Sequence, residues 1–202
     1  MQRISMYLAG NIQKSHSTYD EQFWTAKEMD TIKQILAPAE VDFLNPAERM
    51  DDLANQKSVF GRDMTQVYSA DVVFVDARQR RGLGVGAEMM WAKVNNKPLI
   101  VWVPEGSYYN QRDVIILGNQ VDHFIHPFVE NLADAFVDTV EQGANWIKQH
   151  IIENTIKPRG IEYIKETMLY YQENYLDVDA PMQKIIQKND KIKSKLLISE
   201  NV

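Results

Sequence analysis

Cysteine is absent from this chain of 202 residues, which therefore forms no disulfide bond, no thiolate metal site and no thiol nucleophile. The chain also lacks the long uncharged apolar run of a signal peptide or a membrane-spanning helix, so we expect a cytoplasmic protein that does not enter a membrane. Positive charge is in deficit, because 22 lysines and arginines face 28 aspartates and glutamates, for a net charge of −6. Without a basic field, we expect small molecules as partners and no nucleic-acid polymer.

Histidine is scarce as well, with four residues in the chain. His123 and His126 stand three apart in a segment expected to be extended, which sends their side chains to opposite faces. No matching pattern of carboxylates accompanies them, so we interpret both as structural residues and expect no metal site.

Short apolar runs alternate with helical periodicity along the first three quarters of the chain. This pattern predicts an α/β fold of the flavodoxin or Rossmann-like type, with a mostly parallel five-stranded sheet flanked by helices. Strands are expected at Ile4–Ala9, Val41–Leu44, Asp71–Asp76, Pro98–Val103 and Val121–Ile125. Helices are expected from Ser17 and Thr18 to just before Pro38, at Val59–Ser69, at Glu88–Asn95 and at Glu130–His150.

The chain changes character from about Asn154, where strands give way to two helical segments separated by Asp177–Pro181. Asp179 and Pro181 are a suitable cap and first-turn residue for the second segment. We therefore divide the chain into an α/β domain at 1–153 and a helical extension at 154–202. A lysine-rich stretch in the extension is interpreted as a solvated helix face rather than as a site for an anionic partner.

Three glycines, Gly82, Gly84 and Gly86, follow the third expected strand and are expected to form a turn that lets the backbone approach a ligand. The spacing is not the G-x-G-x-x-G of a dinucleotide fold. Ligands in open α/β sheets nevertheless bind beyond the carboxyl ends of the strands, and the turn leaves Glu88 at the floor of such a cleft.

Three further candidates are Tyr7 in the first expected strand, Asp63 on the helix before the third strand, and Asp76 at the end of the third strand. Each has a structural alternative: a core tyrosine, a solvated helix carboxylate and a turn residue respectively. Their residue types and order, taken together with the glycines, carry the following resemblance.

The chain resembles the nucleoside 2-deoxyribosyltransferases and the related deoxynucleoside 5'-monophosphate N-glycosidases over roughly residues 1–150. The resemblance rests on Tyr7-Leu8-Ala9-Gly10, on Asp63 followed by Ala70-Asp71-Val72-Val73 and Asp76, on Gly82-Leu83-Gly84-Val85-Gly86-Ala87-Glu88, and on Lys97-Pro98. It implies an enzyme without metal or organic cofactor. It also implies a homo-oligomer whose active sites borrow a loop from a neighbouring subunit.

The resemblance also assigns roles. Glu88 is the expected nucleophile, which captures the oxocarbenium-like C1' of the sugar, and the Tyr7 hydroxyl is expected to orient it. Asp63 is expected on the side of the departing base, as the acidic group that is held partly protonated and gives the base a proton or a hydrogen bond, with Asp76 nearby as a further candidate. Gly10 and the three glycines of the turn are expected to line the substrate site.

The residues expected at the 5' end of the sugar depart from the family pattern. Gly82 replaces the serine of the monophosphate glycosidases, and Asp113 occupies the position in the borrowed loop that is serine or asparagine in the family. A carboxylate accepts a hydrogen bond from a 5'-hydroxyl but repels a phosphate, which favours a nucleoside.

The opposite argument comes from three arginines beside the glycines, Arg78, Arg80 and Arg81, which are suited to clamp a phosphate. The sequence therefore leaves three functions open. The first is transfer of deoxyribose from a 2'-deoxynucleoside to a free nucleobase, with hydrolysis of a nucleotide or modified nucleoside as the second. The third is a sensor that binds a nucleotide without turning it over.

Overall fold

The structure is a computed structural model that describes residues 2–11 and 23–196. The chain forms two compact units, Met1–Gly160 and Ile161–Val202. The expected helix start at Ser17 and Thr18 lies outside the described residues. The first unit carries every candidate site residue named above.

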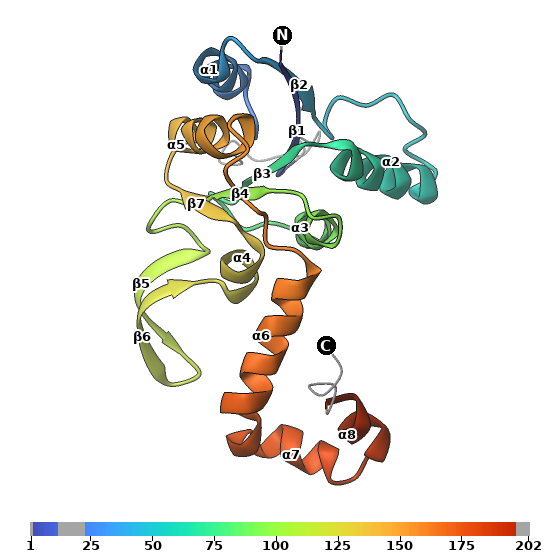
Figure 1. Cartoon of the computed structure of the whole chain (residues 1–202), viewed down its shortest axis with the longest axis vertical. Helices are drawn as coiled ribbons and strands as arrows, with labels where there is room; N and C mark the ends of the chain where they lie inside the picture. The colour runs from blue at the N-terminus through green and yellow to red at the C-terminus, as the bar shows by residue number, and fades with distance from the viewer. Residues whose placement is uncertain (1, 12–22, 197–202) are drawn as a thin grey trace. The chain divides into compact units, whose positions relative to one another are not determined.

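The first unit is built on a five-stranded parallel sheet with the order β2-β1-β3-β4-β7 (Figure 1). Its strands are β1 Arg3–Ala9, β2 Glu40–Leu44, β3 Val72–Asp76, β4 Leu99–Trp102 and β7 Ala135–Val137. The predicted α/β fold with a five-stranded parallel sheet is confirmed. Every residue of β3 and β4 is buried, as expected for central strands covered on both faces.

Helices cover both faces of this sheet, with α1 and α5 on one side and α2 and α3 on the other (Figure 1). The helices of the unit are α1 Ala26–Leu36, α2 Gln56–Ser69, α3 Leu83–Val94, α4 Pro127–Leu132 and α5 Val140–Ile147, which continues into the π-helical segment η1 Lys148–Ile152. Leu8 and Phe74 belong to the core under α1 and α5. On the other face, the Trp91 indole nitrogen of α3 donates to the Met64 carbonyl of α2 at 3.0 Å.

The fifth strand of the sheet differs from the prediction. The segment expected there forms β6 Asn119–Ile125, which pairs antiparallel with β5 Asn110–Ile116 in a separate two-stranded sheet. The fifth strand is instead β7, within the stretch predicted as one helix at Glu130–His150, so that helix is wrong. The three residues of β7 pair with β4, and Thr139 then caps α5 by accepting a hydrogen bond from the Gln142 amide at 3.2 Å.

The glycine segment is also helical where a turn was predicted. Helix α3 begins at Leu83 rather than at Glu88, with Gly82 as its N-cap, so Gly84 and Gly86 lie inside its first turns. Gly82 has a φ of −81°, which any residue adopts. Burial of one face of α3 outweighs the low helix propensity of the two glycines.

Helix α1 begins at Ala26, where Thr25 and Glu28 form a capping box. The Thr25 hydroxyl accepts from the Glu28 amide at 3.3 Å, and the Glu28 carboxylate accepts from the Thr25 amide at 2.7 Å. This cap fixes the start of the helix that shields Trp24 and the core behind it.

The second unit consists of α6 Ile161–Asn174, the 3₁₀ turn η2 Leu176–Val178, α7 Ala180–Ile186 and α8 Asp190–Leu196. The predicted cap at Asp179 is confirmed, because its carboxylate accepts from the Met182 amide at 3.1 Å. The second of the two predicted helical segments is divided into α7 and α8. The Asn189 side chain accepts a hydrogen bond from the Lys191 amide at 3.1 Å and caps the start of α8.

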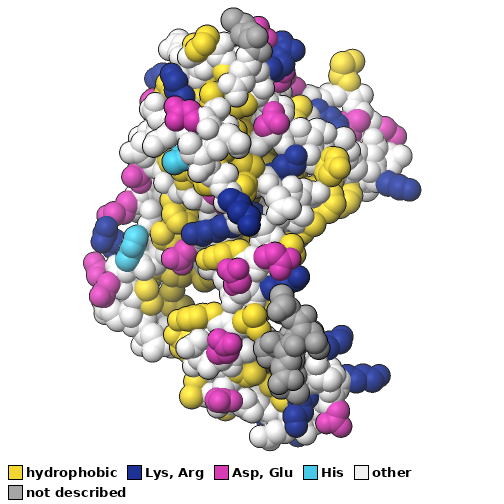
Figure 2. Space-filling view, in the orientation of Figure 1, with side chains coloured by type: hydrophobic (Ala, Val, Ile, Leu, Met, Phe, Trp, Pro, Cys, Tyr) yellow, Lys and Arg dark blue, Asp and Glu magenta, His cyan; other side chains and the backbone are white. Residues whose placement is uncertain are grey.

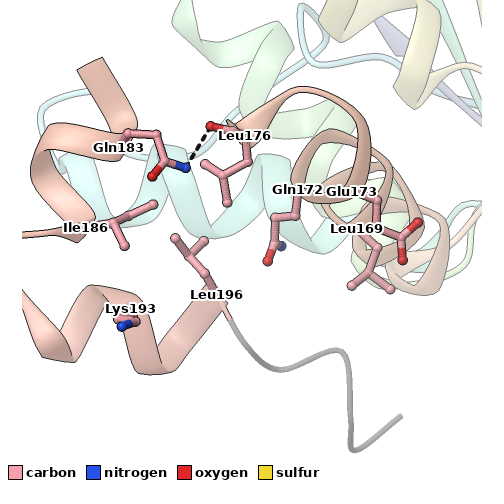
Figure 3. Close-up of a pocket in the computed structure, with 8 residues that line it drawn as sticks. All are labelled: Leu169, Gln172, Glu173, Leu176, Gln183, Ile186, Lys193 and Leu196. Carbon is pink, nitrogen blue, oxygen red and sulfur yellow. Dashed lines mark hydrogen bonds between the residues drawn. The ribbon is translucent and has the colours of Figure 1, made fainter. Parts of the chain in front are cut away.

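This unit contains a hollow of about 260 Å³, and Figure 3 shows the side chains from α6, α7 and α8 that line it. Leu169, Leu176 and Leu196 contribute apolar surface to it, and the Gln183 side-chain amide closes one side by donating to the Leu176 carbonyl at 2.9 Å.

On the face shown in Figure 2, acidic and basic side chains are interspersed over the α/β unit. Among the helices formed by residues 2–11 and 23–196, none has the length and apolar character needed to cross a membrane.

Candidate functional site

Tyr7 lies in β1 on the sheet face that α2 and α3 cover. Side chains alternate along a strand, and Met6 and Leu8 belong to the core under α1 and α5, so Tyr7 projects to the opposite face. Its ring is fully buried, and in the sheet it stands beside Leu44 and Val73. The strand therefore delivers a phenol hydroxyl toward the two helices that carry Asp63 and Glu88.

Glu88 comes from the second turn of α3 and is 8% exposed. Burial raises the pKa of its carboxyl group from 4.5 to about 7, and the charge of Asp63 acts in the same direction, whereas the Tyr7 hydroxyl opposes both. Its Oε2 atom is buried without a hydrogen-bond partner among the described residues. A buried carboxyl that titrates near neutral pH and has an open oxygen is typical of a reactive group.

The hydroxyl of Tyr7 is the second open group. Burial raises the pKa of this phenol strongly, and the nearby Glu88 and Asp63 carboxylates raise it further. The phenol therefore keeps its proton and serves as a hydrogen-bond donor. Tyr7 and Glu88 influence one another's pKa, yet within the described part of the chain the Tyr7 hydroxyl completes no hydrogen bond of normal geometry.

Asp63 lies on α2, and two arginines hold it. The Arg49 Nη1 atom lies 3.3 Å from its Oδ1, and the Arg62 Nη1 atom lies 3.5 Å from the same oxygen. Arg49 also grips both oxygens of Asp51, with two nitrogen–oxygen distances of 2.7 Å. Asp63 is thus an ion-paired carboxylate, which accepts hydrogen bonds rather than donating them.

Sequence analysis missed Arg49, Asp51 and Arg62. The Asn45–Ala54 stretch has turn composition, and an arginine in a turn is normally solvated. The signal that was present is charge alternation, because an Arg-x-Asp pair precedes α2 and an Arg-Asp pair lies within it. Which charges meet depends on how the turn folds back on α2, and no local pattern encodes that.

The structure does not bring Asp76 together with Tyr7, Asp63 and Glu88. Asp76 ends β3 in phase with Val72 and Phe74, so its side chain lies on the α1 face, where it is fully buried. The Arg78 Nε and Arg81 Nη2 atoms lie 2.9 and 2.8 Å from its Oδ1. Its charge is therefore engaged by two guanidinium groups.

The ion pairs with Asp76 occupy two of the three arginines that were expected to clamp a phosphate. Arg78 also reaches Glu28 at 2.9 Å, and its guanidinium stacks over the Trp102 ring at 3.6 Å. The Arg81 side chain is 3% exposed. Arg78 and Arg81 thus serve structural ion pairs, whereas Arg80 is exposed and lies over Tyr108 at 5.5 Å.

The predicted glycines lie in three places. A Cβ at Gly84 would lie 3.9 Å from the Glu88 Oε1 atom, so the missing side chain keeps the carboxyl group open on one side. A Cβ at Gly10 would lie 3.3 Å from the Trp24 indole nitrogen and 3.4 Å from the Asp76 Cβ, so Gly10 lies beside the Asp76 pairs.

Gly82 and Gly86 line a cavity of about 390 Å³ on the other flank of α3. Its wall is mostly apolar, with Met89 and Leu132 among its members, and it includes Arg81 and His126. Glu88 does not line this cavity. His126 precedes α4, and His123 contacts the Asn110 side-chain oxygen at 3.2 Å.

Asp113 lies in β5 of the two-stranded sheet, exposed and with a φ of 51°. Its expected contact with the sugar of a neighbouring subunit stays a prediction. Across residues 2–11 and 23–196, there is no cluster of three or more His, Cys, Asp or Glu side chains able to hold a metal ion.

A comparison of the chain with models of known protein families finds no match, and a comparison with curated proteins finds none either. The resemblance to the deoxyribosyltransferases therefore rests on the motif residues themselves. What the structure adds is the meeting of Tyr7, Asp63 and Glu88 between β1, α2 and α3.

Proposed function

We propose that this chain cleaves the N-glycosidic bond of a 2'-deoxynucleoside and transfers the deoxyribosyl group to a second nucleobase, with Glu88 as the nucleophile. One observation carries the proposal: a buried carboxyl group with an open oxygen, next to a buried tyrosine hydroxyl and an ion-paired aspartate. These three groups come from three different elements of the fold.

In the first step, the ionised Glu88 carboxylate forms a bond to C1' while the bond from C1' to the base nitrogen breaks. The electron pair of that bond leaves with the base, which takes up one proton from the solvent. In the second step, a nitrogen of the incoming base attacks C1' and gives up one proton to the solvent, while the bond from C1' to the Glu88 oxygen breaks and the carboxylate is restored. Two displacements at C1' retain its configuration.

The surroundings of Glu88 suit both steps. A carboxyl group with a pKa of about 7 is ionised in a substantial fraction of molecules at neutral pH and remains a good leaving group in the second step. The protonated Tyr7 hydroxyl orients the carboxylate, and Asp63 offers an acceptor to a donor group on the base.

A nucleoside fits better than its monophosphate. The Arg78 guanidinium pairs with the carboxylates of Asp76 and Glu28, and the Arg81 Nη2 atom pairs with Asp76, so carboxylates already offset both positive charges, although the Arg81 Nη1 atom has no hydrogen-bond partner among the described residues. Asp113 adds a negative charge if the β5–β6 hairpin reaches a neighbouring site.

The test is an exchange assay with deoxyinosine and free cytosine or adenine. We expect a new deoxynucleoside from the wild type, and a loss of at least about a thousandfold in rate for Glu88→Ala and Glu88→Gln. Glu141→Gln, which changes an exposed glutamate on α5, is the matched control and should retain full activity.

Four results would contradict the proposal in different ways. Free base without exchange would identify a hydrolase, and binding without turnover would identify a sensor. Activity that persists in Glu88→Ala would reject the site itself. Faster reaction with deoxynucleoside monophosphates would reject the preference for a nucleoside.

A further inference from the structure

Arg49 occupies an unusual position for a residue in a loop. Its side chain is 9% exposed although it precedes α2 in a turn-rich segment. Its Nε and Nη2 atoms each lie 2.7 Å from one oxygen of Asp51, in the two-pronged arrangement that fixes a guanidinium plane. The remaining nitrogen, Nη1, is thereby aimed at Asp63, 3.3 Å from Oδ1 and 3.4 Å from Oδ2.

Arg62 is the other cation at Asp63, but its guanidinium is bound elsewhere. It donates to the Glu48 carbonyl at 2.5 Å and to the Gln66 side-chain oxygen at 3.2 Å, and it reaches Asp63 at 3.5 Å. Arg49 is the more buried of the two, with the shorter contact. It is therefore the better candidate for controlling where the Asp63 carboxylate points.

The groups that act on Glu88 come from two elements. Tyr7 on β1 lowers the pKa of the Glu88 carboxyl group, and the charge of Asp63 on α2 raises it. Arg62, also on α2, acts on Tyr7. Asp63 is thus the charged residue through which a change at Arg49 reaches Glu88.

We propose that Arg49 is a positioning residue for the reaction described above: bound to both oxygens of Asp51, it fixes the Asp63 carboxylate and offsets part of its charge, and Glu88 responds through Asp63. This inference rests on the proposed function for its consequence in catalysis. Its physical content, an effect of Arg49 on Glu88 through Asp63, can be measured without turnover.

The direction of the effect follows from the charges. The negative charge of Asp63 raises the pKa of Glu88. Removal of the Arg49 cation exposes Glu88 to more of that charge, so its pKa rises further. Removal of the Asp63 charge lowers the pKa of Glu88. In that variant Arg49 has no Asp63 charge to offset, so replacing Arg49 should then change the pKa of Glu88 little.

The experiment follows the titration of Glu88 by carboxyl ¹³C NMR in the full-length chain, with the signal assigned by its loss in Glu88→Gln. We expect a higher midpoint in Arg49→Met, a lower midpoint in Asp63→Asn, and nearly the wild-type midpoint in Arg49→Lys. The double variant Arg49→Met/Asp63→Asn should titrate like Asp63→Asn alone.

Arg3→Met is the matched control, because Arg3 also pairs with two carboxylates, Glu40 at 2.6 Å and Asp42 at 3.3 Å, but on an exposed surface. It should leave the Glu88 midpoint unchanged. An unchanged midpoint in Arg49→Met would overturn the inference. So would a rise in the double variant above Asp63→Asn, because Arg49 would then act without Asp63.

The exchange reaction supplies a second readout. At pH 6, we expect Arg49→Met to lower kcat by about threefold to tenfold with a smaller change in KM, since a midpoint one unit higher lowers the ionised fraction about tenfold. At pH 9 the two proteins should converge. A loss of rate that is equal at all pH values would indicate a structural role and overturn the inference.

Failure of this inference and failure of the proposed function are distinguishable. If the wild type shows no turnover, the proposed function fails, while the NMR midpoints still decide whether Arg49 acts on Glu88. If Arg49→Met does not fold, Arg49→Gln takes its place: it must raise the Glu88 midpoint, and an unchanged value overturns the inference.

Discussion

Replacement of Glu88 with glutamine is expected to stabilise the protein, and more so as the pH rises. The carboxyl group has a pKa of about 7 in the folded chain, against 4.5 for its ordinary value. When folding raises the pKa of a group, the stability that this group contributes is fully present below its pKa in the unfolded chain. That stability is lost as the pH rises through its pKa in the folded chain. At alkaline pH, folding therefore carries the cost of burying an anion.

The size of this cost follows from the gap between the two values. At about 1.36 kcal/mol per pKa unit, a rise from 4.5 to about 7 corresponds to about 3 kcal/mol at pH 8.5 and to less than about 1 kcal/mol at pH 5. Glutamine carries no charge and has nearly the same shape. Glu88→Gln should therefore raise the free energy of unfolding by about 3 kcal/mol at pH 8.5 and by much less at pH 5.

Urea unfolding followed by tryptophan fluorescence measures this difference, because all four tryptophans lie in the first unit. Wild type and Glu88→Gln are compared at pH 5 and pH 8.5, with Glu141→Gln as the exposed control. Equal pH dependence in wild type and Glu88→Gln would refute the reasoning, since Glu88 would then titrate alike in the folded and unfolded chain.

Four further substitutions test the packing of the same unit, each by urea unfolding. Gly143→Ala places a Cβ 2.1 Å from an aromatic ring and should cost about 1–3 kcal/mol, whereas Gly61→Ala, with nothing within 4 Å in α2, should stabilise by about 0.5–1 kcal/mol. Lys93→Met leaves the buried Asp134 carboxylate without its ammonium partner and should lower the free energy of unfolding by about 3–5 kcal/mol. An unchanged free energy of unfolding would show that the ion pair is not needed for stability. Thr25→Ala removes the cap of α1 and should cost about 1 kcal/mol, and an unchanged midpoint would contradict the role of the capping box.

Strongly patterned segments could be predicted from the sequence. The buried runs around Phe74 and Ile100 form central strands, and Asp179 caps α7 as expected. The fifth strand could not be predicted, because Ala135–Val137 is three residues long and is a strand only through its pairing with β4. The alternating β6 segment carries a stronger local signal, yet its partner is β5.

The candidate site shows the same division between local and tertiary information. Tyr7 and Glu88 lie next to one another as the motif implies, with Asp63 acting on both, because each belongs to a well-patterned element. Asp76 points to the opposite face of the sheet because side chains alternate along β3. Which of the two faces carries the site is known only when the strands are paired in register. Arg49 depends on how a turn folds, so its pairing with Asp63 follows from the tertiary structure alone.

The hairpin of β5 and β6 has a consequence for solubility. Leu117 and Gly118 both take left-handed φ values, 49° and 84°, in a tight two-residue turn, and the ribbon contains two strands, each with an outer edge that pairs with no other described strand. Such edges invite strand addition and fibrous aggregation. The left-handed φ of Asp113 interrupts the ribbon at mid-length, where the register passes from Arg112–His123 to Val114–Val121, and disfavours its growth into a wider sheet.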